Sequence, residues 1–280
     1  MAEGMISTSQ KRKRQRRRFF RKSLVILAEH GSWSWLLVPF LVGAGVAGRL
    51  HFAALLVLCG ALAAFLMRQP ATAWLRIRQG RGRRADEKLA AGWALGLALL
   101  ATLCLVWLLL LGRTPLLWLL LPLAFLFTLY LGVAQINRSR TRTLWMELAG
   151  AAGLAALAPA AYVAATGRLD TTAWLLWAIM ATQNAAGVLY VRLRLADRHE
   201  REMGRLPVLW GHLLGLAVVV ATAAWGNVPW PVVLPFAGFL LRAVWTVAAP
   251  RPIANVKHFG FTEVGVEILS GLWIVASYLL

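Results

Sequence analysis

The sequence predicts an all-α, polytopic membrane protein with nine transmembrane helices. Three observations predict this fold class. Of the 280 residues, 60% are hydrophobic and only 15% are charged, whereas a soluble domain is about half apolar and a quarter charged. Nine apolar stretches are long enough to cross a bilayer, which takes about 18 residues or more as a helix. The connections between these stretches are alternately rich and poor in basic residues.

The nine predicted spans follow one another closely, so we expect a single transmembrane domain over residues 29–280. A basic N-terminal arm over residues 1–28 precedes it. The spans cover residues 31–48, 50–67, 89–111, 115–134, 145–166, 172–191, 207–226, 229–247 and 260–280.

The short turns that pair the spans carry glycine. The first and seventh spans end at Gly48 and Gly226, and Gly112 and Gly167 directly follow the third and fifth spans. Glycine is the residue that a tight turn requires. Small residues within the spans, such as Gly43, are expected where two helix backbones approach closely in lipid.

Two longer connections, 68–88 and 192–206, combine apolar residues with charges in a helical pattern. They begin about 125 residues apart, with four spans starting between them, which predicts a weak internal duplication of spans 1–4 in spans 5–8. Two like loops on one face are expected to frame one cavity.

Basic residues predict the orientation in the membrane. Of the 30 Lys and Arg residues, 26 lie in the N-terminal arm and in the connections that follow the even-numbered spans. The alternate connections hold three, Arg49, Arg113 and Arg168. Basic connections remain on the cytoplasmic side, so we expect the N-terminus in the cytoplasm and the C-terminus outside.

The same charge pattern indicates the partners of the N-terminal arm. Residues 11–22 read KRKRQRRRFFRK, within a chain of net charge +19. Such an arm is attracted to anionic lipid heads by about 1 kcal/mol per basic residue. Nucleic acid is not an expected partner, because no aromatic-interleaved basic motif accompanies the charge. No cleavable signal is expected, since Glu29 and His30 interrupt the first apolar run.

The ionisable and amide side chains singled out within the spans fall in the predicted cytoplasmic half or at its boundary. Since an ionisable group in hydrocarbon costs about 2.5–3.5 kcal/mol, their common depth predicts one polar cavity that opens toward the cytoplasm. The candidate ligand-binding residues are His30, Arg68, Gln69, Arg76, Glu147, Gln183, Asn184, Arg192, Arg194, Arg205, His258, Glu263 and Glu267.

Two carboxylates in the last span suggest alternatives to a ligand site. Glu263 and Glu267 lie one helical turn apart and share a face, and Arg242 lies at a similar depth in the eighth span. A structural ion pair with Arg242 is one interpretation. Binding of a proton or a metal ion, with His258 nearby, is another.

No catalytic residue and no cofactor are predicted from motifs. Cys59 and Cys104 lie inside apolar runs, where a thiol behaves as a small hydrophobe. Neither a serine nucleophile elbow nor a nucleotide-binding glycine motif is present.

The nine-span layout, with long cytoplasmic connections after spans 2 and 6, resembles the UbiA superfamily of intramembrane prenyltransferases. The similarity is most specific over residues 191–211, VRLRLADRHEREMGRLPVLWG. The resemblance implies a UbiA-like bundle and magnesium-bound diphosphate between two acidic loops. Residues 68–74, RQPATAW, depart from this pattern because they contain no carboxylate, and the weak metal candidates are Asp197, Glu200 and Glu202.

A second resemblance covers nearly the whole chain. Residues 29–33 (EHGSW), Pro39 with Phe40, residues 68–70 (RQP) and residues 260–263 (GFTE) are similar to the YwiC-like family of bacterial membrane proteins. This resemblance implies a multi-pass protein of the bacterial cytoplasmic (inner) membrane, and it implies no reaction.

These observations leave three functions open. The first is binding of an isoprenoid or quinone-type lipid in the cytoplasm-facing cavity, with arginines in place of metal. The second is a divergent prenyltransferase, for which Mg²⁺ would be the cofactor. The third is a transporter or exporter that works through the buried carboxylates. Whether the protein is an enzyme stays open.

Overall fold

The structure is a computed structural model that describes residues 31–49, 51–136, 143–250 and 252–280. Within these ranges the chain is helical and contains no strand. Its elements are α3 (Gly31–Val46), α4 (Phe52–Arg78), η1 (Arg84–Asp86), α5 (Glu87–Leu110), α6 (Leu116–Ile136), α7 (Leu144–Ala155), α8 (Leu157–Thr166), α9 (Thr171–Arg198), α10 (Leu206–Ala224), η3 (Trp230–Val232), α11 (Val233–Ala248) and α12 (Val256–Leu279).

The described helices are those of a multi-pass membrane protein. Eight of them, counting α7 with α8 as one, are long and apolar enough to cross a bilayer, and α3 is a shorter apolar helix over its described residues. The eight coincide with eight of the predicted spans. Large apolar side chains on α5 and α6 point outward, including Leu95, Leu103, Trp118 and Phe125, as expected for helices that face lipid.

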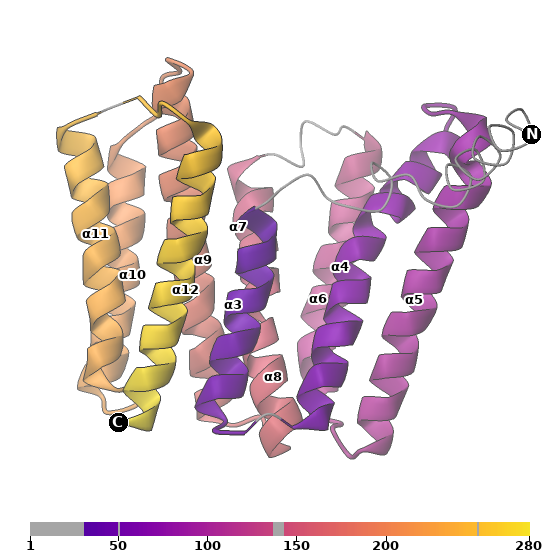
Figure 1. Ribbon diagram of the computed structural model, residues 1–280, viewed down its shortest axis with the longest axis horizontal. Coiled ribbons are helices and arrows are strands. Elements are labelled where there is room, and N and C mark those ends of the chain that lie inside the picture. The colour runs from indigo at the N-terminus through magenta and orange to yellow at the C-terminus, as the bar shows by residue number, and fades with distance from the viewer. Residues whose placement is uncertain (1–30, 50, 137–142, 251) are drawn as a thin grey trace, which may run out of the picture.

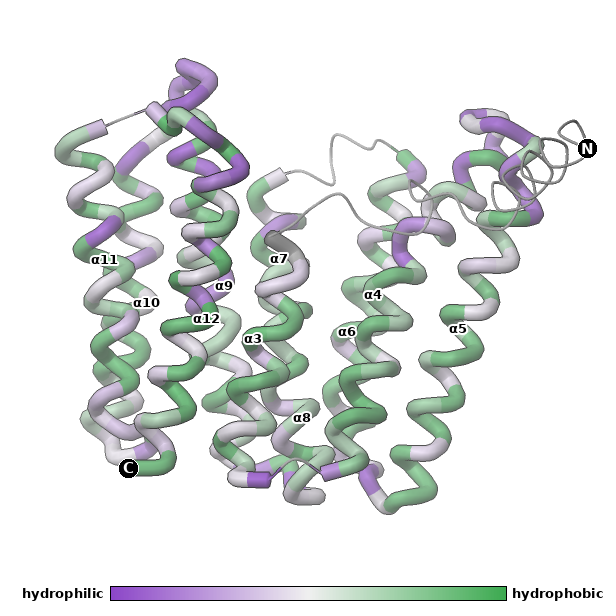
Figure 2. The backbone as a smooth tube through the Cα atoms, in the orientation of Figure 1, coloured by the Kyte–Doolittle hydropathy of each residue, from purple (hydrophilic) through white to green (hydrophobic). Residues whose placement is uncertain are grey.

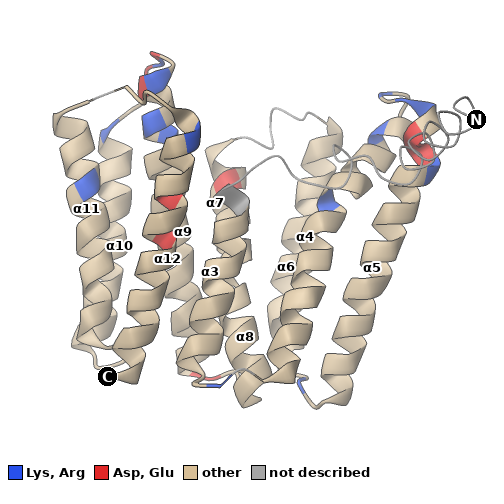
Figure 3. Cartoon of the chain, viewed as in Figure 1, with Lys and Arg blue, Asp and Glu red and all other residues tan. Residues whose placement is uncertain are grey.

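Figure 2 shows that the middle of the bundle is apolar, and Figure 3 shows that most charged residues gather at one end of the helices. The turn glycines lie at the opposite end. Gly48, Gly112, Gly167 and Gly226 have φ angles of 68°, 75°, 80° and 73°, a left-handed conformation that glycine adopts without steric cost. The predicted glycine turns are therefore confirmed.

The bundle has a central group of helices with a group on either side (Figure 1). Helices α3, α7 and α8 pack together in the centre, where α8 also contacts α4 and α9. Helices α4, α5 and α6 lie on one side, and α9 to α12 lie on the other. The polar ends of α4 and α9 therefore stand apart.

The two long connections are largely helical, as their sequence pattern predicts. Helix α4 continues through Pro70 to Arg78, and α9 continues to Arg198. Both connections lie at the charged end of the helices but at opposite sides of the bundle (Figure 1). They do not lie side by side as expected for two loops that frame one cavity, because α3 and α7 stand between α4 and α9.

The centre of the bundle depends on small residues. The fifth span breaks between α7 and α8 at Ala156, since Pro159 has no N–H to donate to the carbonyl of Ala155. The backbone of Ala158 then lies against Gly43 of α3 so closely that a Cβ on Gly43 would collide with it. Glycine at this position lets α3 approach α8, as predicted for helix packing in lipid.

Candidate functional site

A small polar hollow lies between α9, α11 and α12. Its polar lining consists of Gln183 from α9, Arg242 from α11, and Glu263 and Glu267 from α12. The remaining lining residues are Gly187, Phe239 and Val266. The hollow measures about 10 Å³, which is room for about one water molecule. We call it the polar groove.

The residues that α9 and α12 contribute to the groove recur at helical spacing, so those of each helix lie on one face. On α9, Gln183, Gly187 and Tyr190 are spaced by four and three residues, and on α12 the same holds for Glu263, Glu267 and Ser270. Residues at these spacings lie above one another on a helix. Helices α9 and α12 therefore each present these residues along one face.

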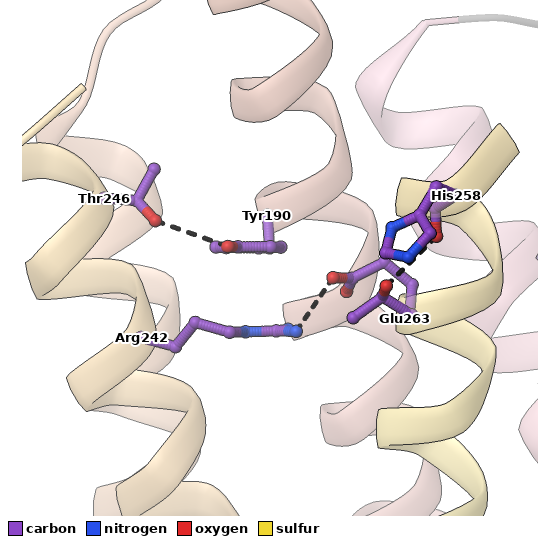
Figure 4. A network of polar contacts seen from close by, with 6 residues as sticks. Tyr190, Arg242, Thr246, His258 and Glu263 are labelled. Atoms are coloured by element: carbon purple, nitrogen blue, oxygen red, sulfur yellow. Dashed lines mark hydrogen bonds and ion pairs between the residues drawn. The ribbon is translucent and has the colours of Figure 1, made fainter. Parts of the chain in front are cut away.

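An ion pair joins α11 to α12 across the groove. A guanidinium nitrogen (Nη1) of Arg242 lies 2.9 Å from Oε1 of Glu263, and the two side chains are 25% and 14% exposed. Figure 4 shows Arg242 lying flat beneath the ring of Tyr190, with its Cζ 3.8 Å from the ring centroid. The Tyr190 hydroxyl lies 3.3 Å from that of Thr246. The counter-charge predicted from the depth of Arg242 is confirmed.

Glu267 lies deeper and is held from the other side by α3. The side chains of Ser34 and Trp35 hydrogen-bond to its carboxyl group. Gly187 leaves space for this arrangement, since a Cβ there would lie 3.4 Å from Oε1 of Glu267 and 3.5 Å from Nε1 of Trp35. Glu267 is 8% exposed.

Gln183 is the most buried of the polar lining residues, at 2% exposed. Its Oε1 accepts a hydrogen bond of 2.8 Å from Ser270. Three buried polar atoms of the lining have no hydrogen-bond partner among the described residues, namely Nε2 of Gln183, Nε of Arg242 and Oε2 of Glu267. Such atoms in a protein interior are uncommon and call for a physical explanation.

Other predicted site residues serve as connections between helices. The Asn184 amide donates to the carbonyls of Trp35 and Ala151, at 3.2 and 3.0 Å, and so ties α9 to α3 and α7. Arg192 pairs with Glu147 of α7 at 2.8 Å. These interactions stabilise the packing of α9 against the centre of the bundle.

The remaining predicted residues do not gather at the groove. Arg68, Gln69 and Arg76 belong to α4, on the far side of α3 and α8, where the Arg68 guanidinium lies over the rings of Phe65 and Tyr130. The sequence-based expectation of one shared cavity therefore needs correction. These residues share a similar predicted depth in the membrane with the groove residues, but α4 does not adjoin α9, α11 and α12.

Two further candidate residues, Arg194 and His258, do not line the groove. Arg194 lies over the ring of Phe259, with Cζ 5.9 Å from its centroid. The side chain of His258 is exposed in the first turn of α12, and His30 falls outside the described residues.

A larger depression lies at the charged end, between the α9–α10 and α11–α12 connections. It measures about 700 Å³ and includes Asp197, Glu200, Glu202, Arg201 and Arg205 in its lining. Asp197 pairs with Arg205 at 2.9 Å. Within the described ranges, no group of three or more His, Cys, Asp or Glu side chains is placed to hold a metal ion.

Sequence reasoning missed several residues of the groove. Tyr190, Gly187 and Ser270 are not ionisable, and Trp35 and Ser34 belong to a helix far away in the sequence. The helical spacing from Gln183 and from Glu267 would have indicated the first three. The contribution of α3 carries no signal of this kind.

Comparison with known proteins now gives a family likeness for the first part of the chain. Residues 26–162 match the YwiC-like protein family. This YwiC-like segment is just under half of the chain and runs from the end of the N-terminal arm into α8. It supports the resemblance seen at residues 29–33, Pro39 with Phe40, and residues 68–70. No curated protein and no solved structure matches the chain.

The polar groove lies mostly outside the YwiC-like segment. Its lining residues belong to α9, α11 and α12, all beyond residue 162. Ser34 and Trp35, which hold Glu267, belong to the YwiC-like segment through α3. The site is thus assembled from both parts of the chain.

Proposed function

We propose that this integral membrane protein binds an isoprenoid or quinone-type lipid, and that one polar atom of the lipid head group enters the polar groove. The observation that carries the proposal is that, among the described residues, three that line one hollow each have a buried polar atom without a hydrogen-bond partner. A buried polar group without a partner costs about 1–3 kcal/mol. A ligand atom that forms hydrogen bonds with these groups removes this cost, and the removal favours binding.

The surroundings of the groove favour a lipid over a water-soluble ligand. The two helices that flank it expose large apolar side chains, among them Leu241 and Trp245 on α11 and Phe261 and Leu269 on α12. An apolar tail that lies along these helices would remain in contact with hydrocarbon while its head group reaches the groove.

We propose the UbiA-like nine-span topology as the frame for this site. Helix α3 would be the first span, with the N-terminus and the α9–α10 connection in the cytoplasm. The chain's basic residues support this orientation. In this frame the groove lies in the cytoplasmic half of the membrane.

Cysteine labelling tests the orientation. In a background with Cys59 and Cys104 changed to alanine, Arg201→Cys is expected to resist a membrane-impermeant maleimide in intact cells and to react after permeabilisation. Asn227→Cys, in the opposite turn, is expected to react in intact cells. The reverse pattern would overturn the proposed topology.

Lipid binding without magnesium-dependent prenyl transfer fits the residues better than catalysis does. A divergent prenyltransferase would need Asp197, Glu200 and Glu202 as a metal platform, and Asp197 is already paired with Arg205. The corresponding stretch on α4, residues 68–74, contains no carboxylate, whereas bridging of diphosphate by magnesium relies on carboxylates.

Transport through buried carboxylates is a second candidate function. It is favoured by one observation, that Glu263 and Glu267 lie one turn apart in a membrane helix and both line the groove. In proteoliposomes, Glu267→Gln would abolish flux if the carboxylate carries a coupled proton. Flux that is unchanged in this variant would remove the transport alternative.

Co-purified lipid tests the main proposal. We expect mass spectrometry of the detergent-purified protein to show an isoprenoid or quinone-type lipid enriched over membrane phospholipid. Gln183→Leu should reduce that enrichment several-fold, because it removes a donor from the groove. Gln135→Leu on α6 is the matched control and should retain the lipid. Bulk phospholipid alone in the wild-type protein would contradict the proposal.

A further inference from the structure

The unpaired atoms of the groove define the hydrogen-bonding pattern of a ligand. Nε2 of Gln183 and Nε of Arg242 are donors, and Oε2 of Glu267 is an acceptor when its carboxyl group is ionised. A hydroxyl group has one hydrogen to donate and two lone pairs to accept. Its one donor and two acceptor positions therefore match the three atoms in number and kind.

Other head groups pair with only part of this set. A fully ionised phosphate has acceptors only, so it would leave Oε2 of Glu267 without a donor. An ammonium group has donors only, so it would leave Gln183 and Arg242 without an acceptor. A methyl ether keeps the lone pairs of the hydroxyl oxygen but cannot donate.

The charge of the groove also disfavours an anion. Among the described residues, Arg242 is the only basic one in the lining, and its guanidinium is already paired with Glu263. Glu267 is a second carboxylate in the same lining. The groove therefore has no excess positive charge with which to offset the desolvation of a phosphate.

The size of the hollow agrees with a single hydroxyl oxygen. A space of about 10 Å³ accommodates about one water molecule, and a hydroxyl oxygen replaces a water with little change in volume. The rest of the ligand would then lie outside the hollow.

We propose that the group bound in the groove is a neutral hydroxyl. It donates a hydrogen bond to Oε2 of Glu267 and accepts one from Nε2 of Gln183. This rests on the proposed function, and it narrows the ligand to hydroxyl-bearing isoprenoid lipids, either a prenyl alcohol or a quinol. Quinones and prenyl phosphates are excluded as preferred ligands by the same pattern of donors and acceptors.

Binding of matched lipids to the full-length protein in nanodiscs tests this inference. The probes share one prenyl tail and differ in the head: an alcohol, its methyl ether, its monophosphate, a quinol and the corresponding quinone. We expect the alcohol or the quinol to bind about tenfold more tightly than the methyl ether, the phosphate and the quinone. Whichever of the two binds more tightly identifies the source of the hydroxyl.

Substitutions in the groove test whether its side chains recognise the hydroxyl. Glu267→Leu should reduce the preference for the hydroxyl over the ether to about twofold or less, because it removes the acceptor that the ether cannot use. Gln183→Leu should weaken the binding of the alcohol and of the ether alike, and Gln135→Leu should leave both at the wild-type value. Because the comparison among probes uses the wild-type protein, a variant that fails to fold does not prevent the test.

The outcomes separate the two proposals. Equal affinity for alcohol, quinol and ether, or tightest binding of the phosphate or quinone, would overturn the hydroxyl inference while lipid binding stands. If none of the probes binds and no isoprenoid co-purifies, the proposed function itself fails and the hollow holds water only.

Discussion

Replacing Arg242 with alanine is expected to destabilise the protein more than any other single removal of charge considered for the groove. The substitution leaves the Glu263 carboxylate, 14% exposed, without its guanidinium partner. Loss of one member of a buried ion pair costs about 3–5 kcal/mol, because the remaining charge stays desolvated. The free energy of unfolding in detergent, from chemical denaturation, measures this.

The matched control is the exposed pair of Arg78 and Glu87. Their atoms lie 3.8 Å apart, and the side chains are 63% and 39% exposed. Arg78→Ala should cost about 0–1 kcal/mol. A combined Arg242→Met and Glu263→Met variant should recover much of the stability lost in Arg242→Ala, because it removes both charges together. Equal costs for Arg242→Ala and Arg78→Ala would show that the groove pair does not stabilise the fold.

Gly43→Ala is expected to prevent α3 from packing against α8. The added Cβ would collide with the backbone of Ala158, and a backbone atom cannot rotate away as a side chain can. Overpacking of a core costs about 1–3 kcal/mol, and contact with backbone places this substitution at the upper end. We expect a lowered melting temperature and a several-fold smaller monodisperse peak in size-exclusion chromatography.

Gly238→Ala is the control, because it makes the same substitution at a position where the added Cβ has no close neighbour. Gly238 lies within α11, and a Cβ there would meet nothing within 4 Å. Since alanine favours a helix interior over glycine by about 0.5–1 kcal/mol, this variant should be as stable as the wild type or more so. If Gly43→Ala were as stable as Gly238→Ala, the close approach of α3 and α8 would not contribute to stability.

The helices were largely predictable because crossing a membrane is a local requirement. Each span must contain enough consecutive apolar residues, and eight of the nine predicted stretches coincide with helices that meet this requirement. The turn glycines were predictable for the same reason, since Gly48 and Gly226 adopt their left-handed conformation within a few residues of chain. The break at Ala156 inside the fifth span was missed.

The candidate site was predictable only in part. Depth along the membrane normal placed Arg242 with Glu263, and that pairing is present. The same reasoning placed Arg68 with them, and Arg68 lies on α4 against Phe65 and Tyr130 instead. Residues at one depth can belong to helices on opposite sides of a bundle.

Sequence alone thus determined which segments enter the membrane, where they turn and which end carries the charge, because hydropathy and turn geometry act over a few consecutive residues. The tertiary structure decided which polar side chains meet. That choice depends on which helices are neighbours and on how each is rotated about its axis, and both follow from contacts between distant segments, such as Gly43 against Ala158 and Trp35 beside Glu267.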